Sequence, residues 1–295
     1  MILADFEIVE AHDVLGVEAG EAFESTAQVT AAPRVFDLPT MWRRGRYAPS
    51  LFADSDARSF AWLGRAVSGG MPMLPMIDER PLDTGEFWAR LARENARDEH
   101  GIQKRSQLKL SDFIRIRQSG EQHDLLYRLP RWVAPGDKSI EPAKLYWSDP
   151  GLLHSALGWD AQRFEGNLAG LSALEIKRLQ TSWKQDSWEG FVVTSLVRCA
   201  GLRAKASVWR GPYGEIDLIL DWTDARETWA VEVTMGRKKD LRSLGLGQSH
   251  TQASQAFVVY NQQVARPSLV GLPRNVGAID CVTLGQALRA VRAGP

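Results

Sequence analysis

The chain has 295 residues, of which 44% are hydrophobic and 24% are charged, and its formal net charge is zero. This length and composition are typical of one or two globular domains, each with a core of its own. No apolar run approaches the roughly 18 residues of a membrane span, and acidic residues near the start replace the basic and apolar pattern of a signal peptide.

These features predict a cytoplasmic protein without a membrane partner. Cys199 and Cys281 lie far apart in apolar segments, so we expect reduced, buried thiols rather than a disulfide. The phosphate-binding motif G-x-x-x-x-G-K-[ST] does not occur, and the nearest string, residues 136–139, lacks its first glycine. We therefore expect no ATP binding by that motif.

The charges are distributed unevenly along the chain. Residues 1–33 contain seven acidic residues and no Lys or Arg, whereas the rest of the chain contains 36 basic and 29 acidic residues, a net charge of +7. This asymmetry predicts an acidic N-terminal arm, residues 1–40, and a body whose charge suits a polyanion such as DNA.

Helices dominate the prediction for the first half of the body. One helix over residues 55–67 begins at the N-cap Ser55 and ends before the Gly- and Pro-rich residues 69–76. A second helix covers residues 84–98. Residues 102–133 then mix basic with apolar side chains and finish in a strand.

Three basic residues in this last region, Arg115, Arg117 and Arg128, are candidates for contacts with nucleic-acid phosphates. The alternative is a solvated basic face on a module that only packs against its neighbours. The residue pattern leaves both interpretations open.

The second half of the chain alternates helices with strands. Asp149 and Pro150 begin a short helix that stops at Gly158. The elements predicted after it are a helix over residues 182–200, strands over 204–210, 213–221 and 228–234, a helix to about residue 244, strands over 256–260 and 277–282, and a helix over 284–292. This order is typical of an α/β fold with a mixed sheet.

The hairpin of residues 213–234 carries the main functional hypothesis. If its polar middle forms the turn, Asp217 lies opposite Glu232, about 5 Å away at Cβ. Alternation of side chains along each strand puts Ile219 and Ala230 on the same face as these acids and Ile216 on the other face.

Two like charges in direct opposition destabilise a sheet. The repulsion is relieved if both side chains are solvated on an exposed face, if one is protonated, or if a cation lies between them. Because Ile219 and Ala230 indicate that this face is half covered, we favour a metal ion held by Asp217 and Glu232.

Four motifs, taken in order, resemble one known family. They are LYWSDPGLL at residues 145–153, SWEGF at 187–191, GEID at 214–217 and EVT at 232–234. Asp217 followed by EVT resembles the Asp…Glu-x-Lys core of the PD-(D/E)XK restriction-endonuclease-like fold. The set is similar to the C-terminal domain of many bacterial and archaeal, hence prokaryotic, AAA+ ATPases, and the resemblance covers residue 41 to the C-terminus.

The resemblance implies an α/β (α+β) protein with two domains after the arm. A helical, degenerate winged-helix domain, residues 41–146, would precede a restriction-endonuclease-like mixed sheet flanked by helices, residues 147–295. We expect the winged helix to be degenerate, since the span from Trp88 to Trp132 looks too short for both helices of that motif. The ATPase module of the family is not expected in this chain.

A site for Mg²⁺ or Mn²⁺ is also implied by the resemblance. Asp217 and Glu232 would be ligands, and Glu189, on the preceding helix, would assist. An equally good explanation of Glu189 is a first-turn acid at the positive end of a helix. Thr234 replaces the catalytic lysine of the family, and its hydroxyl can hold water but carries no charge.

A basic residue from elsewhere would then have to orient or deprotonate the attacking water. The candidates are Lys238 and its neighbours Arg237 and Lys239 after the hairpin, and Lys184 in the helix.

Two functions follow from the resemblance. The first is a DNA-associated protein whose nuclease-like domain is a weak or inactive metal-dependent deoxyribonuclease. The alternative is a catalytically dead regulatory or adaptor remnant of the ATPase family that binds a protein partner.

Overall fold

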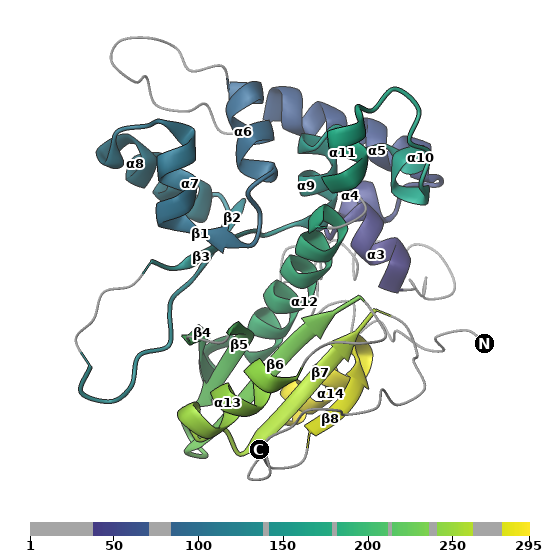
Figure 1. Ribbon diagram of the computed structural model, residues 1–295. Helices are drawn as coiled ribbons and strands as arrows, with labels where there is room; N and C mark the ends of the chain where they lie inside the picture. Colours follow the sequence, from purple (N-terminus) through teal and green to yellow (C-terminus); the bar gives the residue numbers. More distant parts are fainter. Residues whose placement is uncertain are drawn as a thin grey trace. The chain divides into compact units, whose positions relative to one another are not determined.

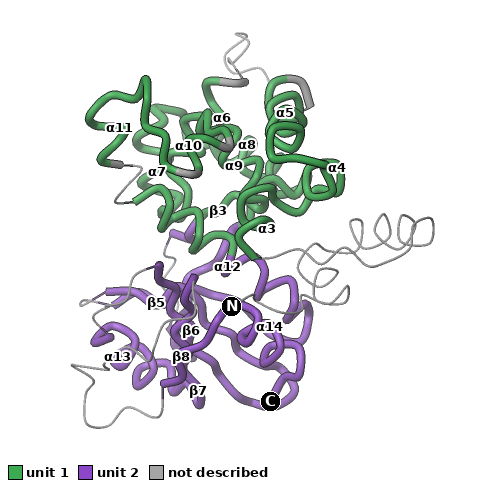
Figure 2. The backbone as a smooth tube through the Cα atoms, turned by 90° about the vertical axis from the view of Figure 1, so that its right-hand side faces the viewer, with its two compact units in different colours: residues 1–127, 145–191 green, residues 128–144, 192–295 purple. Residues whose placement is uncertain are grey.

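The computed structural model describes residues 38–70, 84–137, 142–178, 182–211, 214–235, 241–261 and 279–295. The chain divides into two compact units, drawn in separate colours in Figure 2. Unit 1 comprises residues 1–127 and 145–191, and unit 2 comprises residues 128–144 and 192–295. Almost all of the predicted acidic arm lies outside the described residues, and the predicted domain division stays a prediction.

The first part of the chain is mainly helical (Figure 1). Its elements, in chain order, are α3 (Leu38–Arg44), α4 (Ala48–Leu51), α5 (Asp56–Arg65), a π-helical turn (Ala66–Gly70), α6 (Thr84–Ala92), β1 (Arg97–Asp98), α7 (Glu99–Ser106), α8 (Leu110–Gln122), β2 (Leu126–Leu129), β3 (Lys144–Trp147), α9 (Pro150–Ala156), α10 (Ala161–Glu165) and α11 (Ala173–Arg178).

Two predicted helix starts in this part are confirmed. The side chain of Ser55 accepts a hydrogen bond from the backbone N–H of Arg58 and caps α5. Asp149 accepts one from Leu152 and caps α9, with Pro150 in the first turn. Both side chains satisfy backbone donors that have no partner inside the helix.

The order from α6 to β3 is helix, strand, helix, helix, strand, strand, and the strands form an antiparallel sheet in the order β1-β3-β2. The expectation that this span is too short for two helices is wrong. Helix α7 needs only eight residues, and the three residues 107–109 connect it to α8, which has 13.

The core of unit 1 lies between these helices and the sheet. It collects apolar side chains from α5 to α9 and from β3, including the fully buried Leu63, Trp88 and Ile116. The ring of Trp88 packs edge-on against Trp147 of β3, with ring centroids 5.7 Å apart. This geometry stabilises the pair beyond the burial of the two rings.

Gly45 stands at the closest approach between the α3 end and the start of α9. Its φ is +73°, and a Cβ atom placed there would lie 2.3 Å from Oδ1 of Asp149. Both the backbone conformation and the lack of space require glycine.

Asp149 is fully buried and accepts a hydrogen bond of 2.6 Å from the backbone N–H of Arg46. Burial raises the pKa of this carboxyl, while the charge of Arg46 opposes the rise.

Unit 2 is built on a five-stranded mixed sheet in the order β4-β5-β6-β7-β8. The remaining elements are α12 (Lys184–Ala200), β4 (Ala204–Gly211), β5 (Gly214–Trp222), β6 (Glu227–Thr234), α13 (Arg242–Thr251), β7 (Gln255–Tyr260), β8 (Ile279–Thr283) and α14 (Leu284–Ala293). Strands β4, β5 and β6 are antiparallel, and β6, β7 and β8 are parallel. The predicted α/β class and this order of elements are confirmed, except that α13 runs to Thr251.

Both faces of the sheet are covered. Leu244 of α13 packs in one cluster with Ile219, Ala230 and Val258 of three adjacent strands. Residues that alternate with these, such as Val231, are as completely buried, which is expected of a sheet between two layers. Figure 1 shows α13 in front of the sheet and α14 behind it.

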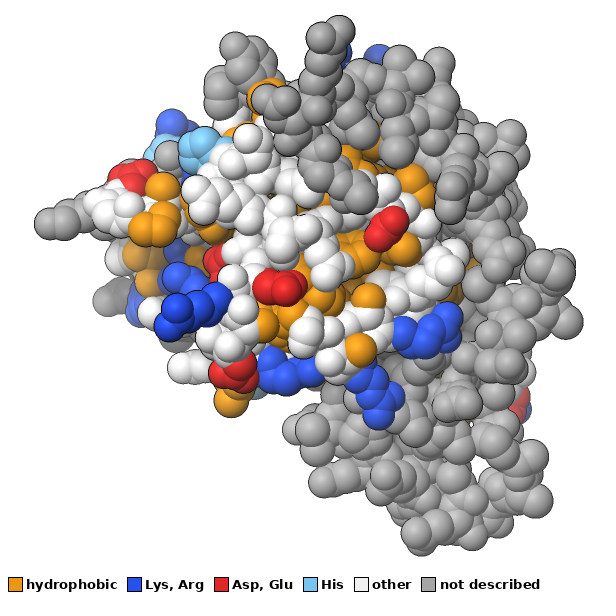
Figure 3. Space-filling view, turned by 90° about the horizontal axis from the view of Figure 1, so that it is seen from below, with side chains coloured by type: hydrophobic (Ala, Val, Ile, Leu, Met, Phe, Trp, Pro, Cys, Tyr) orange, Lys and Arg blue, Asp and Glu red, His pale blue; other side chains and the backbone are white. Residues whose placement is uncertain are grey.

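Surface and cysteine features complete the description. On the face shown in Figure 3, basic, acidic and apolar side chains are interspersed in the described part. Cys199 and Cys281 are half-buried and do not form a disulfide with each other. None of the helices in the described part of the chain has the length and apolar character that a membrane span requires.

Replacing Gly45 by alanine is expected to lower the free energy of unfolding by about 2 kcal/mol or more. Alanine is strained at this positive φ, and its methyl group overlaps the side chain of Asp149. The matched control is Gly64→Ala in α5, where a Cβ atom has no neighbour within 4 Å. That variant should be as stable as the parent or up to about 1 kcal/mol more stable. Chemical denaturation followed by circular dichroism measures both, and equal stabilities would contradict the role of Gly45.

Candidate active site

The hairpin of β5 and β6 has the register predicted from the sequence. Leu218 pairs with Val231 and Ile219 with Ala230, and the regular pairing of β5 with β6 ends there, one residue before Asp217 and Glu232. Both acids are almost completely buried, with 3% and 2% of their surfaces exposed. The alternative of two solvated acids on an exposed face is therefore excluded.

A β-bulge lies in β5 at the candidate site. Against β4, Ser207 pairs with Ile219 and Trp209 with Ile216, so two residues of β5 stand opposite one residue of β4. The bulge resets the alternation of side chains, and Ile216 joins Ile219 in the cluster under α13. The expectation that Ile216 faces the other side is wrong for this reason. The expectation that Asp217 shares the face of Ile219 and Ala230 is wrong as well, because Asp217 alternates with its neighbour Ile216. A bulge re-aims side chains, and bulges are frequent beside active sites.

Asp217 acts as a hydrogen-bond partner for the neighbouring strand. Its Oδ2 accepts a hydrogen bond of 2.8 Å from the backbone N–H of Val233. The side chain thus accepts a hydrogen bond from the backbone of β6 at the point where the regular pairing of β5 with β6 ends. This bond fixes the orientation of the carboxylate and leaves Oδ1 directed elsewhere.

Lys144 supplies a cation at this carboxylate. Its Nζ lies 2.5 Å from Oε1 of Glu215 and 3.7 Å from Oδ1 of Asp217, and only 3% of its side chain is exposed. Arg210 adds two hydrogen bonds to Oε2 of Glu215, from Nε at 3.1 Å and from Nη2 at 3.0 Å. Burial alone would raise the pKa of Glu215, but Lys144 and Arg210 outweigh it and lower that pKa.

Sequence reasoning missed Lys144 and the role of Glu215. Glu215 stands two residues before Asp217 in the same strand, which is a local signal that both carboxylates face one site. Lys144 lies 71 residues before Glu215, and nothing in its own surroundings marks it as a partner. Only the tertiary fold brings the two together.

The other predicted site residues have different surroundings. Thr234 is buried at the end of β6, with 6% of its surface exposed. Lys184 donates a hydrogen bond of 2.8 Å to the carbonyl oxygen of Phe164 in unit 1. Lys238 lies outside the described residues.

Glu189 lies on α12, in the part of the helix that belongs to unit 1. It is 7% exposed and accepts a hydrogen bond of 2.8 Å from the hydroxyl group of Tyr146. Because α12 begins at Lys184, Glu189 stands in the second turn, and Asp186 is the acid of the first turn. The interpretation of Glu189 as a first-turn acid is therefore wrong.

The three arginines predicted to contact phosphates differ in exposure. The side chain of Arg115 is 54% exposed and pairs with Asp112 on the same helix. Arg117 is only 14% exposed and pairs with Glu99 of α7 at 3.3 Å. Arg128 is half-buried. Arg115 thus has a largely exposed side chain that pairs with the buried carboxylate of Asp112, whereas Arg117 joins α7 to α8.

The donor set of unit 2 fits a hard divalent cation. Carboxylate oxygens of Glu215 and Asp217 lie within 4.8 Å of each other, and Mg²⁺ binds such oxygens at about 2.1 Å. Lys144 and Arg210 are the cations next to these two carboxylates.

Comparison with known proteins finds no protein similar to this chain. No family model, no curated protein and no solved structure matches this chain. The resemblance to the nuclease-like family therefore stays a hypothesis based on the order of its motifs.

Lys144→Met is expected to destabilise the protein by about 3 kcal/mol, because the buried carboxylates then face each other without the ammonium. Lys205→Met, at an exposed position of β4, is the matched control and should change the stability by less than about 0.5 kcal/mol. Adding Asp217→Asn to Lys144→Met should recover part of the loss. Denaturation curves of the four proteins test this, and equal costs for the two lysines would contradict it.

Proposed function

We propose that unit 2 is a PD-(D/E)XK nuclease-like domain that cleaves DNA phosphodiesters, with Lys144 in the role of the missing catalytic lysine. The observation that carries the proposal is the buried Lys144 ammonium beside Asp217, next to a bulge that aims the carboxylate. Thr234 cannot provide this charge. The proposal thus replaces Lys238, Lys239, Arg237 and Lys184 by a lysine from another strand.

The residues divide the work in the following way. Asp217 and Glu215, whose oxygens lie within 4.8 Å of each other, would hold Mg²⁺ or Mn²⁺, and the family resemblance adds Glu232 as a ligand. When bound, the ion supplies a Lewis acid for the phosphate and lowers the pKa of a coordinated water.

Lys144 contributes a positive charge and N–H donors, which the carboxylates lack. Its ammonium group is a donor of three N–H bonds, one of which is directed to Glu215. Its positive charge stabilises the negative charge that develops on the phosphate during hydrolysis. The N–H of Val233 keeps the Asp217 carboxylate in place, so no reorientation is needed during the reaction.

Unit 1 supports a DNA-binding role for the same protein. The element order from α6 to β3 and the sheet order β1-β3-β2 are those of a winged helix, and we assign α8 as its recognition helix. One stripe of α8 is exposed and contains no acid; it consists of Ser111, Arg115, Gln118 and Gln122. Such side chains suit phosphates and base edges.

A binding role without catalysis is the second candidate. It is favoured by Thr234 at the lysine position and by the ion pairs of Glu215, which already engage Lys144 and Arg210. In this case the protein is a regulatory or adaptor relative of the ATPase family that binds DNA or a protein partner.

Nicking of supercoiled plasmid by the full chain in Mn²⁺ tests the first candidate. Asp217→Asn and Glu232→Gln should abolish the activity, and Lys144→Met should reduce it by about 10² to 10⁴-fold. Isothermal titration with Mn²⁺ gives a second readout, in which Asp217→Asn loses binding and Lys205→Met retains it.

Two results would decide against this proposal. Mn²⁺ binding without nicking in the parent protein would select the binding role. Nicking that survives Asp217→Asn would show a contaminating nuclease and remove the support for the site.

The exposure of the arginines predicts how α8 variants behave. Arg115→Ala should weaken DNA binding several-fold and reduce the salt dependence of log K by about one unit. Arg117→Ala should instead lower the free energy of unfolding, because it leaves Glu99 without its partner on α8. Fluorescence anisotropy over a series of salt concentrations, with denaturation curves, separates the two. Equal loss of DNA binding in both variants at equal stability would contradict the assignment.

A further inference from the structure

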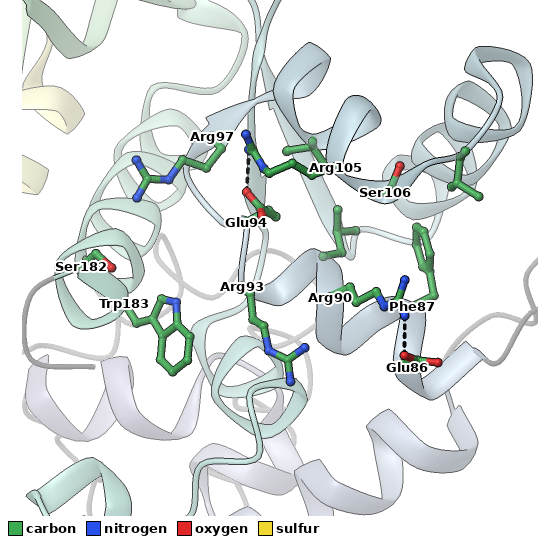
Figure 4. A pocket seen from close by; sticks show the side chains of 13 residues that line it. Glu86, Phe87, Arg90, Arg93, Glu94, Arg97, Arg105, Ser106, Ser182 and Trp183 are labelled. Carbon is green, nitrogen blue, oxygen red and sulfur yellow. Dashed lines mark hydrogen bonds and ion pairs between the residues drawn. The ribbon is translucent and has the colours of Figure 1, made fainter. Parts of the chain in front are cut away.

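A cavity of about 530 Å³ lies wholly within unit 1, away from the residues assigned above. It is lined by side chains of α6, of residues 93–97, of α7 and of the segment that begins α12 (Figure 4). Its volume is in the range of small-molecule sites, which is about 300–1,000 Å³.

The lining is strongly basic. Four arginines contribute to it, namely Arg90, Arg93, Arg97 and Arg105, against two glutamates, Glu86 and Glu94. Because Arg97 also pairs with Asp186 at 3.1 Å, one positive charge remains in excess at the cavity. Clustered guanidinium groups match the geometry of phosphate oxygens and bind them through paired N–H donors.

The existing ion pairs do not block such a ligand. Arg90 pairs with Glu86 and Arg105 with Glu94, each at 2.6 Å, and the arginine side chains are 58% and 52% exposed. Exposed pairs of this kind contribute little to stability, about 0–1 kcal/mol, so an anion replaces them at low cost. Arg93 is exposed and forms no ion pair with any residue in the described part of the chain.

An aromatic wall completes the cavity. Trp183 is half-buried, and its ring is 6.5 Å from that of Trp159, centroid to centroid. In the view of Figure 4, Trp183 lies to one side of Arg93, with Arg90 and Phe87 on the other side. An indole face beside arginines is a stacking surface for a nucleobase, because every base has a π-face.

We propose that this cavity binds a nucleoside phosphate, with the base against Trp183 and the phosphate on Arg93 and its neighbouring arginines. The same chemistry is offered by a free nucleotide and by one nucleotide unit of a single strand. The site is independent of the nuclease proposal, since none of its lining residues belongs to unit 2.

Isothermal titration of the full chain with AMP, GMP, CMP and UMP tests the proposal, with adenosine and inorganic phosphate as partial ligands. At least one nucleotide should bind, and each partial ligand should bind about tenfold more weakly or worse. Arg93→Gln should weaken nucleotide binding about tenfold or more. Trp183→Leu should weaken nucleotide binding and leave phosphate binding unchanged.

The matched control is Arg58→Gln, an exposed arginine of α5 that does not line the cavity, and it should bind as the parent does. Arg93 is exposed, so Arg93→Gln decides the question even if Trp183→Leu fails to fold. Asp217→Asn in unit 2 should retain nucleotide binding, which separates this site from the proposed nuclease.

A 5′-phosphorylated single-stranded DNA hexamer distinguishes the two sources. If the hexamer binds more tightly than every mononucleotide and Arg93→Gln removes that binding, the ligand is a unit of a strand. If a mononucleotide binds more tightly, the ligand is a free nucleotide. The proposal is overturned if no nucleotide binds, if phosphate binds as tightly as the nucleotides, or if hexaglutamate displaces the nucleotide equally well.

Discussion

The ammonium group of Lys144 lies among carboxylates that the fold of unit 2 removes from water. Glu215 and Asp217 are acids of one strand with oxygens within 4.8 Å of each other, and Asp217 is almost completely buried. Without a cation, two charges this close in a low-dielectric interior repel by several kcal/mol. That is a large part of the 5–15 kcal/mol by which a domain is stable. The segment that carries Lys144 packs against β5 and compensates part of this charge.

The backbone at this point is adapted to the same interaction. The bulge in β5 turns the acid-bearing part of the strand relative to the rest, and the carboxylate of Asp217 takes the N–H of Val233 in place of a regular strand partner. The bulge thus interrupts the regular pairing of the strands, and the side chain of Asp217 replaces the lost hydrogen bond. The protein itself thus provides a cation, Lys144, at the carboxylate of Asp217.

Burial sorts the basic residues of unit 1 into different roles. Arg117 is covered and holds α7 to α8, whereas Arg115 is largely exposed and pairs with the buried Asp112 of its own helix. Of the arginines around the cavity, Arg90 and Arg105 pair with glutamates, and Arg97 pairs with the largely buried Asp186. The surfaces of unit 1 that suit an anion are the exposed stripe of α8 and the cavity beside α6.

The sequence by itself determined the α/β class, the order of strands and helices in unit 2, the caps at Ser55 and Asp149, and the register that pairs Leu218 with Val231 in the hairpin. These features depend on periodicity, turn chemistry and capping, which act between residues close together in the chain. Only the tertiary structure decided that both acids are buried, that Ile216 changes faces at a bulge, and that the span after Trp88 holds two helices. It alone brought Lys144 to Glu215 and Asp217, because an ion pair between distant segments leaves no periodic trace in either one.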